Sequence, residues 1–455
     1  MRGPTSPLVL IYGFIAVIAI GTGLLMLPFA SNSEDSIGLA DRFVQALFTA
    51  TSAVAVTGLA VVDTYEAWTF FGQAVIMVLF FIGGLGFMTG AAFLMLIIGQ
   101  RLGLRGQLLL RAGLAETRLG EIASLVRRIV VFSVAIQVVG TFLLFLRWYV
   151  FGQLWEGISF REALWQSAFH AVSAFNNAGF DILPNATVGG PSLESFRADI
   201  PVLLIVAALI IIGGLSYFVM TDIASNRRFR RWRLDTKLVI VGSATLLVVG
   251  TLVFLASEWT RPSTLGQQSV PEKFVDSFFH SATTRTAGFS TVDYNVISPG
   301  NHLTTEIFML IGGASASTAG GIKINTFMVM LFAVGATLAG KTRVNAFGRE
   351  LPAVIVQRAM VVGAASMAML LSLFIALVIA QPELDFRRAL FEIISAFGTV
   401  GLSTGITADL NTAARLVIVV AMFLGRFGPL TLALLMVGRE AEEPYRFASE
   451  RVRIG

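Results

Sequence analysis

Four glycines recur along this chain in similar surroundings, and a leucine or phenylalanine follows each of them. They are Gly58 in "AVTGLA", Gly179 in "NNAGFD", Gly288 in "RTAGFS" and Gly401 in "GTVGLS". A similarity at this regular, long interval indicates that one structural module is used four times. Glycine lets backbones adopt left-handed conformations and approach each other closely. Four such loops could present rings of carbonyl oxygens that replace the hydration shell of a bare monovalent cation.

The similarity extends beyond the glycines, because a phenylalanine precedes each one by nine or ten residues: Phe48, Phe169, Phe279 and Phe391. For a single glycine, packing between membrane helices is the alternative explanation. Four glycines in matched register favour the explanation that these loops coordinate a cation. The four candidate filter segments are therefore Val56, Thr57, Gly58 and Leu59; Asn177, Ala178, Gly179 and Phe180; Thr286, Ala287, Gly288 and Phe289; and Thr399, Val400, Gly401 and Leu402.

The composition places these segments in a membrane protein. Of 455 residues, 55% are hydrophobic and 13% are charged, and the mean hydropathy is +0.79, which leaves too little polar surface for a water-soluble globule. A helix needs about 20 apolar residues to cross the hydrocarbon core. We expect eight crossings, the first of them retained and not cleaved as a signal peptide, near 8–29, 68–98, 126–148, 200–221, 237–257, 304–339, 353–380 and 413–438.

The basic residues set the expected orientation. Most of the 33 Lys and Arg residues lie in three connections, 101–128, 227–237 and 341–358, or at the two ends of the chain. By the positive-inside rule these parts face the cytoplasm. We therefore expect a multi-pass protein of the plasma membrane, the inner membrane of a bacterial-type cell, with both termini cytoplasmic, and we attribute the net charge of +5 to topology and not to nucleic-acid binding.

Each of the remaining connections carries a semi-hydrophobic segment that runs into a repeat glycine, near 43–55, 162–175, 274–284 and 388–397. About a dozen residues cannot cross a bilayer as a helix, so each segment is expected to enter and return. The predicted fold is an all-α integral membrane protein. It has four parallel helix, pore-helix, filter-loop, helix repeats around one pseudo-fourfold pore, in modules 1–100, 101–235, 236–345 and 346–440, with a cytoplasmic tail 441–455.

The sixth stretch is interrupted by small residues in "GGASASTAGGIK". Such a run weakens a helix and is tolerated at membrane depth only beside protein or a cavity. The alternative is a close-packed helix crossing. The candidate gate loop, expected to be mobile and to obstruct the pore, consists of Gly312, Gly313, Ala314, Ser315, Ala316, Ser317, Thr318, Ala319, Gly320 and Gly321, together with Lys323.

Arg426 lies in the middle of the eighth stretch, in "MFLGRFGPL". A central arginine costs roughly 2.5–3.5 kcal/mol on insertion scales, so it should face a cavity or a partner. A pore barrier to cations and a structural salt bridge to an acidic pore-region residue such as Glu392 are the two roles that the sequence leaves open. Asp181 and Asp293 follow the second and third filter segments and are candidates for filter support or for an attractive outer vestibule.

Several chemistries are disfavoured by the sequence. The chain has no Cys and three His, which makes a metal centre improbable apart from K⁺ in the filter. The stretch 335–342, "GATLAGKT", matches the phosphate-loop pattern but closes a hydrophobic span, where no nucleotide-binding unit surrounds it. We therefore expect no nucleotide on this chain, no nucleic-acid partner and no enzymatic activity.

At this point the chain resembles the Trk/Ktr/HKT superfamily of cation transporters over essentially its whole length, and most closely the Ktr membrane subunits. The four glycines match that family's filter glycines, so the resemblance implies a potassium-selective pore within one subunit. Gly58 implies potassium, because a serine at this position accompanies sodium transport in the plant branch. The first pore-module helix begins by about residue 8, without the extra N-terminal helices typical of Trk, which favours Ktr.

The resemblance also implies a loop gate below the filter and an Arg426 side chain that projects into the pore. It implies a homodimer, in which the tail "YRFASERVRIG" packs at the interface, and a cytoplasmic ring of RCK-type regulatory subunits that bind nucleotide. The basic inner face would suit either that ring or lipid headgroups. The expected function is passive K⁺ uptake down the electrochemical gradient, with Na⁺ as a candidate activator.

Three other functions stay open at this stage. One is a Na⁺-permeable or K⁺/Na⁺-coupled transporter of the same superfamily. Another is a secondary solute transporter, which predicts inverted repeats and discontinuous helices around a central site. The third is a receptor or scaffold without conduction, which would leave the four glycine loops unexplained.

Overall fold

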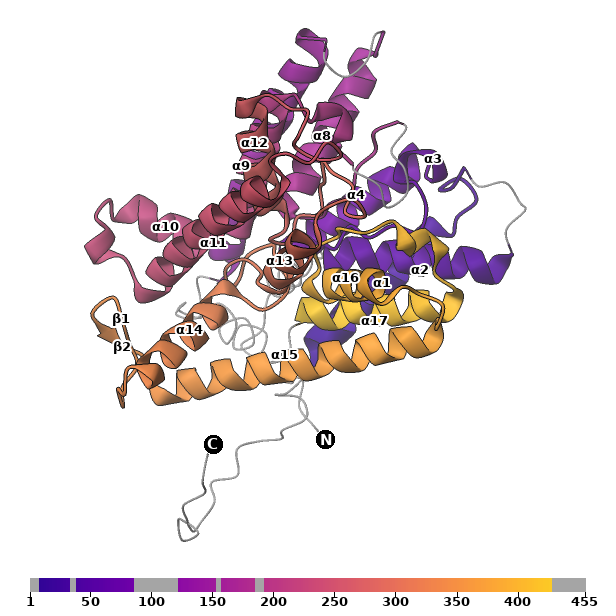
Figure 1. Ribbon diagram of the computed structural model, residues 1–455. Coiled ribbons are helices and arrows are strands. Elements are labelled where there is room, and N and C mark those ends of the chain that lie inside the picture. Colours follow the sequence, from indigo (N-terminus) through magenta and orange to yellow (C-terminus); the bar gives the residue numbers. More distant parts are fainter. Residues whose placement is uncertain (1–7, 33–37, 86–121, 153–156, 185–191, 428–455) are drawn as a thin grey trace.

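The structure, a computed structural model, describes residues 8–32, 38–85, 122–152, 157–184 and 192–427 (Figure 1). In these residues it is almost entirely helical. The one sheet in this part of the chain is a short antiparallel hairpin, in which β1 (Asn345–Ala346) pairs with β2 (Arg349–Glu350).

The helices fall into four consecutive groups. The first contains α1 (Leu8–Leu25), α2 (Leu39–Ala55), α3 (Thr64–Ala67) and α4 (Phe70–Gly84). The second contains α7 (Ile122–Phe145), the π-helix η1 (Leu146–Val150), α8 (Phe160–Asn176), η2 (Glu194–Phe196), α9 (Ile200–Gly214), α10 (Tyr217–Ser225) and η3 (Phe229–Arg231). The third contains α11 (Leu234–Glu258), α12 (Val270–Thr283), α13 (Pro299–Leu310) and α14 (Ile324–Leu338). The fourth contains α15 (Ala353–Ala380), α16 (Phe386–Gly398), η4 (Ile406–Asp409) and α17 (Thr412–Phe427).

A similar packing recurs in every group and between groups. Each short helix, α2, α8, α12 or α16, packs against the helix before it, and α2, α8 and α16 also pack against a helix that follows in their own group. In the third group the following helix, α13, packs against α11 instead. The following helix also packs against the short helix of the next group, in the pairs α4 with α8, α9 with α12, and α13 with α16. The last pair, α17 with α2, joins the end of the described chain to its beginning, as the yellow and indigo helices in Figure 1 show. The four groups therefore form a closed ring.

The four short helices contain the segments that the sequence predicts to be re-entrant. Three of them, α8, α16 and α12, have capped N-termini: the Ser159 hydroxyl accepts a hydrogen bond from the Glu162 amide, Asp385 accepts one from Arg388, and Ser269 forms a capping box with Glu272. Capping satisfies amides that the first helical turn leaves free. Their C-terminal turns are buried against the rest of the ring, so each helix points inward at its end.

Within the described ranges, three helices are long and apolar enough to cross a membrane, spanning Ser124–Val150, Leu234–Glu258 and Ala353–Ala380. The last has the bounds that the sequence predicts. Three shorter apolar helices are Ile11–Leu25, Phe70–Gly84 and Ile324–Leu338. The count of eight crossings stays a prediction, since the second and eighth stretches and the tail 441–455 extend outside the described residues.

The fourth predicted stretch, 200–221, is not one continuous helix. It divides into α9 and α10, which meet at an angle of 93°. At the break, the backbone makes two tertiary contacts. A Cβ atom on Gly213 would lie 1.7 Å from the Phe175 carbonyl oxygen, and the Gly214 carbonyl accepts a hydrogen bond from the Ala314 amide at 3.0 Å. Ser216 then caps α10 by accepting from the Phe218 amide.

The phosphate-loop-like stretch 335–342 covers the end of α14 and not the beginning of a helix. A phosphate loop places its ligand at a helix N-terminus. The stretch therefore lacks the structural context that the motif requires.

Candidate functional site

The four repeat glycines lie together at the centre of the ring, and all have left-handed backbone conformations. Their φ angles are +90° at Gly58, +67° at Gly179, +81° at Gly288 and +92° at Gly401. A side chain at any of them would be strained. The sequence therefore needs glycine at these positions.

Each glycine also faces the backbone of the next candidate filter segment. A Cβ atom added to Gly58 would lie 2.4 Å from the carbonyl oxygen of Ala178, and one added to Gly179 would lie 2.8 Å from that of Ala287. On Gly288 it would lie 2.6 Å from the carbonyl oxygen of Val400, and on Gly401 it would lie 2.1 Å from that of Thr57. Segment one thus contacts two, two contacts three, three contacts four, and four contacts one. The contacts close a ring of four backbones that leaves no room for side chains.

A shared turn brings the chain from each short helix into this ring. The residue two positions before each glycine has a positive φ angle: Val56, Asn177, Thr286 and Thr399. The residue immediately before each glycine donates its amide back to the helix, from Thr57 to Ser52, Ala178 to Ser173, Ala287 to Thr283 and Val400 to Ser395, at 2.8–3.0 Å. These hydrogen bonds use the amides of the four residues and not their carbonyl oxygens. In the described part of the chain, the carbonyl oxygens of these four residues and of the four glycines accept no hydrogen bond.

Free carbonyl oxygens and helix C-termini are the groups that favour a cation over an anion. The short helices end next to the segments, so the negative ends of their dipoles point toward the ring. The arrangement can coordinate a bare monovalent cation and offers nothing comparable to an anion.

Hydroxyl groups that the sequence analysis missed support the segments. The Ser52 and Ser395 hydroxyls accept hydrogen bonds from the amides of Gly58 and Gly401, both at 3.1 Å. Ser173 donates to the Phe180 carbonyl at 2.7 Å. A serine six residues before the glycine in three of four repeats is the sequence signal that could have identified them.

The third segment uses a related contact, because the Thr283 hydroxyl donates to the Phe289 carbonyl at 2.5 Å. The carbonyls of Phe180 and Phe289 are therefore occupied. The side chains at the last position of each segment, Leu59, Phe180, Phe289 and Leu402, are almost fully buried in the core. These four residues anchor the segments, and the free oxygens lie before them.

A cavity of about 50 Å³ accessible to water lies directly over the ring, and all four glycines line it. We call it the vestibule. Its polar lining consists of Asp63, Thr64, Asp181, Ser192, Ser290, Ser403 and Thr407. Asp293 is not part of the lining, and its carboxylate accepts a hydrogen bond from the Asn295 amide at 2.8 Å.

The two vestibule carboxylates influence each other. Both lie in connections outside the helices that could cross a membrane. Withdrawal from solvent, with repulsion from Asp63 as the second cause, raises the pKa of Asp181 to about 7. Withdrawal from solvent also raises the pKa of Asp63. The vestibule is therefore an oxygen-lined chamber whose negative charge varies around neutral pH.

The candidate gate loop is not helical, so the close-packed helix crossing does not describe it. The chain leaves α13 at Leu310 and resumes as α14 at Ile324. A Cβ atom on Gly320 would lie 1.9 Å from the Thr399 hydroxyl oxygen, and one on Gly321 would lie 3.4 Å from the Gly398 carbonyl oxygen. The loop thus meets the fourth segment at its helical end, whereas the vestibule begins at the glycine.

Hydrogen bonds hold the loop both to itself and to neighbouring elements: the Gly312 amide, for example, donates to the Ile322 carbonyl at 2.8 Å. The amides of Ala314 and Thr318 donate to the Gly214 and Gly213 carbonyls at 3.0 and 3.4 Å, and the Ser315 amide donates to the Asn325 side chain at 3.0 Å. The Lys323 ammonium donates to the Ala319 carbonyl. Ser315 and Ala316 are exposed, and Ala316 has φ +59°, a conformation that costs a residue with a side chain about 1–3 kcal/mol.

Arg426 is buried and connects this loop to the first group of helices. Its guanidinium donates to the carbonyl of Thr318 in the loop and to the carbonyl of Gly83 near the end of α4. The salt bridge to Glu392 is not formed. Glu392 instead accepts hydrogen bonds from the hydroxyls of Ser403, at 2.9 Å, and Thr407. The structure therefore contradicts that alternative for Arg426.

A second internal repeat places Arg426 in context. The sequences "IGGLG", "IGGLS" and "IGGAS" begin glycine pairs at Gly83, Gly213 and Gly312, and "LGRFG" has Gly425 followed by Arg426. A Cβ atom would lie 2.2 Å from the Val54 oxygen on Gly83 and 1.9 Å from the Phe397 oxygen on Gly425. Arg426 thus stands where the other three groups have their second glycine.

Comparisons with known proteins agree with this architecture. The family model TrkH, described as a cation transport protein, matches residues 3–443. The chain is 40% identical to the Ktr system potassium uptake protein B of Bacillus subtilis (strain 168) over 427 residues, which cover 94% of this chain and 92% of that protein. It is 37% identical to the potassium/sodium uptake protein NtpJ of Enterococcus hirae over 461 residues, which cover 100% and 98%.

Among solved structures, the chain is similar to that of the potassium transporter TrkH from Vibrio parahaemolyticus. The TM-score is 0.70 at 18% sequence identity, and the match covers 95% of this chain and 84% of the other. This likeness concerns the fold.

Proposed function

Because the chain belongs to the TrkH family of cation transport proteins and is a multi-pass membrane protein similar to Ktr subunits, we propose that it is the ion-conducting subunit of a potassium uptake system. K⁺ would pass through the ring of the four candidate filter segments, down its electrochemical gradient. An inside-negative potential supplies about 2.3 kcal/mol per charge per 100 mV.

The closed ring of glycine backbones is the observation that supports this proposal most. Every segment contributes free carbonyl oxygens, each glycine adopts a conformation that other residues avoid, and the ring opens into an acidic vestibule. A fold that needed only helix packing at this point would not require four left-handed glycines in mutual contact.

The candidate gate loop would control flux from the other end of the fourth segment. Its glycines pack against Thr399 and Gly398, and the Arg426 guanidinium holds the Thr318 carbonyl. A fixed positive charge beside the path raises the barrier for a cation. Release of the loop from Arg426 and from the end of α9 would open the path.

We further propose a homodimer on a cytoplasmic ring of RCK-type nucleotide-binding subunits, as the name of the Ktr system potassium uptake protein B suggests a multi-subunit system. Both termini and the exposed arginines around η3 and the β1–β2 hairpin would face the cytoplasm, where they would contact that ring or anionic lipids.

Proteoliposomes containing the purified protein test the central proposal. We expect K⁺ influx that follows an imposed inside-negative potential and that exceeds Na⁺ influx, with added regulatory subunits increasing it. A protein that passes no monovalent cation, with or without partner subunits, would refute the proposal.

One second function has a specific observation in its favour. The relative NtpJ is named a potassium/sodium uptake protein and matches the chain over its full length. Equal K⁺ and Na⁺ flux in the same vesicles, or K⁺ flux that requires Na⁺, would support a Na⁺-permeable or Na⁺-activated transporter in place of a strictly K⁺-selective one.

A further inference from the structure

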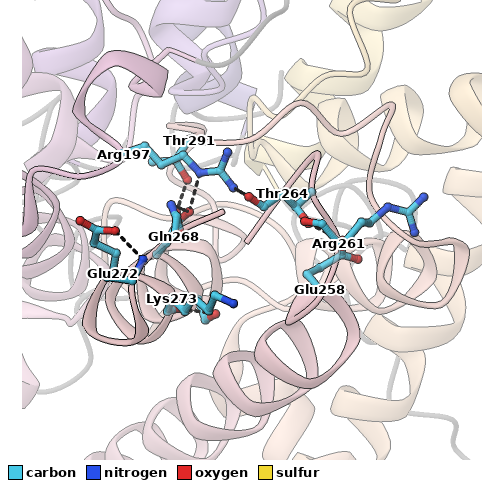
Figure 2. A network of polar contacts seen from close by, with 11 residues as sticks. Arg197, Glu258, Arg261, Thr264, Gln268, Glu272, Lys273 and Thr291 are labelled. Atoms are coloured by element: carbon cyan, nitrogen blue, oxygen red, sulfur yellow. Dashed lines mark hydrogen bonds and ion pairs between the residues drawn. The ribbon is translucent and has the colours of Figure 1, made fainter. Parts of the chain in front are cut away.

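A buried carboxylate, Asp276, joins the third candidate filter segment to the second group of helices. Asp276 lies on α12 and is 0% exposed. Its Oδ2 atom accepts hydrogen bonds from Arg197 Nε at 3.0 Å and from Gln268 Nε2 at 2.9 Å. Its Oδ1 atom accepts one from the Thr291 hydroxyl. In Figure 2 the side chains of Arg197, Gln268 and Thr291 converge on this point.

Thr291 lies three residues after Gly288, so the carboxylate holds the chain just beyond the ring. The adjacent residue, Ser290, is held from the other side. The Ser290 amide donates to the Ser192 hydroxyl at 3.1 Å, and the Leu193 amide donates to the Ser290 carbonyl at 2.8 Å. Ser192 and Ser290 line the vestibule. The chain that follows filter segment three is thus fixed between the loop before α9 and the side of α12.

We call the six residues of this arrangement the Asp276 clamp: Ser192, Leu193, Arg197, Asp276, Ser290 and Thr291. Arg197 completes it, because residues 192–197 form one short loop that contacts Ser290 at its start and Asp276 at its end. The outer side of the clamp is fixed in turn: Arg197 also donates to the Thr264 carbonyl, and the Thr264 hydroxyl donates to Glu258 at 2.8 Å (Figure 2).

The fold itself does not require a carboxylate at this place. Counted from the repeat phenylalanine of each helix, the same position holds Gln45, Gln166 and Arg388 in the other three short helices. Gln166 Nε2 donates to the Ile182 carbonyl at 2.6 Å and Arg388 to the Thr404 carbonyl at 2.8 Å, and both acceptors, like Thr291, lie three residues after their repeat glycine. Withdrawing a carboxylate from water is costly unless charge and hydrogen bonds compensate for it. A polar contact from the short helix to the third residue after the glycine thus recurs in three groups. The third group makes it with a buried carboxylate that also binds Arg197, and the recurrence indicates that this contact positions the chain next to the ring.

We propose that Asp276 is a positioning residue that sets the geometry of the third filter segment through Thr291 and Ser290, and so contributes to discrimination between K⁺ and Na⁺. This inference depends on the proposed function. Discrimination between the two ions depends on where the coordinating oxygens are held, and groups that orient such ligands commonly affect binding about 10- to 100-fold.

The test compares K⁺ and Na⁺ flux in proteoliposomes for monodisperse protein of equal amount. Asp276→Asn and Thr291→Val should each lower the K⁺/Na⁺ flux ratio by about tenfold, and the double variant should lower it no further than either alone. Glu258→Gln is the matched control, because it alters a buried carboxylate of the same network that does not contact residues 288–291. It should change thermal stability and leave the ratio unchanged.

A second variant keeps the test informative if Asp276→Asn does not fold. Asp276→Ala combined with Arg197→Gln removes both charges together, so that neither is left buried without its partner. We expect folded protein with the same lowered ratio. An unchanged ratio in this variant, or an equal decrease in Glu258→Gln, would overturn the inference.

Failure of the clamp and failure of the proposed function give different results. If the unaltered protein conducts K⁺ selectively and the clamp variants do so equally, only the clamp inference is wrong. If the unaltered protein passes neither ion, the proposed function fails and the clamp inference fails with it. As a readout independent of flux, K⁺ should raise the unfolding temperature of the unaltered protein more than Na⁺ does, and this difference should shrink in Asp276→Asn.

Discussion

At the scale of single residues, the ring depends on the absence of side chains. The repeat glycines have positive φ angles, and each lies against a neighbouring carbonyl. The sequence reveals these positions because glycine at fixed intervals is visible without a structure. It does not reveal the supporting hydroxyls or Asp276, because serine, threonine and aspartate have many uses. Their partners lie at separations from six residues, for Ser52 and Gly58, to 79 residues, for Arg197 and Asp276.

The first residue-scale prediction concerns Gly58. In Gly58→Ser the new Cβ atom would approach the Ala178 oxygen to 2.4 Å at φ +90°, and the conformation alone costs about 1–3 kcal/mol. The ring must adjust, so we expect a lower K⁺/Na⁺ flux ratio in proteoliposomes. Gly335→Ser, in α14 where nothing lies within 4 Å of the added Cβ, is the control. Unaltered selectivity in Gly58→Ser would mean that this glycine serves packing alone.

The second concerns the vestibule charge. The pKa of Asp181 is raised to about 7, so its carboxylate is largely ionised at pH 8 and largely protonated at pH 6. A negative charge at the entrance concentrates cations. Influx at low ionic strength should therefore fall as external pH is lowered through 7, with the midpoint near that value.

Asp181→Asn should give low influx at pH 8 and a flat profile between pH 6 and 8. Asp293→Asn is the matched control, because Asp293 does not line the vestibule, and it should keep the pH dependence. A pH profile that persists in Asp181→Asn would assign the titration to another group.

At the scale of elements, the sequence predicts what is local and misses what depends on distant partners. The bounds of α15 and the interruption between α13 and α14 follow from hydropathy and small residues. The 93° break between α9 and α10 does not, because Gly213 and Gly214 look like ordinary membrane-helix glycines until Phe175 and Ala314 are placed beside them. The sequence likewise does not identify the partners of Arg426, because they are backbone carbonyls, which every residue has.

The element-scale prediction concerns the contact between α17 and the candidate gate loop. Arg426→Gln removes the charge and the hydrogen bonds to Thr318 and Gly83. Repulsion of about 1–2 kcal/mol, reasonable for charges at an effective dielectric constant near 20, corresponds to roughly a tenfold rise in K⁺ flux without regulatory subunits. Deletion of residues 314–319 should raise flux in the same direction.

Arg415→Gln is the control, because Arg415 lies on the same helix and donates to the Ala408 carbonyl outside the loop. Its flux should match that of the unaltered protein. If both Arg426→Gln and the deletion leave flux unchanged in folded protein, the loop is not the gate.

At the scale of the whole molecule, the ring closes through contacts between the first and fourth groups, α2 with α17. The repeat predicts that four groups share one plan, but the closure of their contacts is a property of the assembled chain. Orientation in the membrane is a separate whole-molecule property, and the charge distribution alone predicts it.

Because the chain has no Cys, single cysteines report orientation directly. Ser225 precedes α11 and Ser263 follows it, and both are exposed. In intact cells, a membrane-impermeant maleimide should label Ser263→Cys, whereas Ser225→Cys should react only after permeabilisation. The reverse pattern would invert the proposed topology, and the unaltered protein serves as the unlabelled control.

The closure of the ring within one polypeptide has a consequence for how this molecule can change over generations. In a pore assembled from four identical chains, one substitution alters every quadrant at once. Here it alters a single quadrant, as Asp276 on α12 and Arg426 on α17 illustrate. Each quadrant can therefore diverge by small, separately tolerable substitutions, and each substitution changes ion preference through one of the four filter segments only.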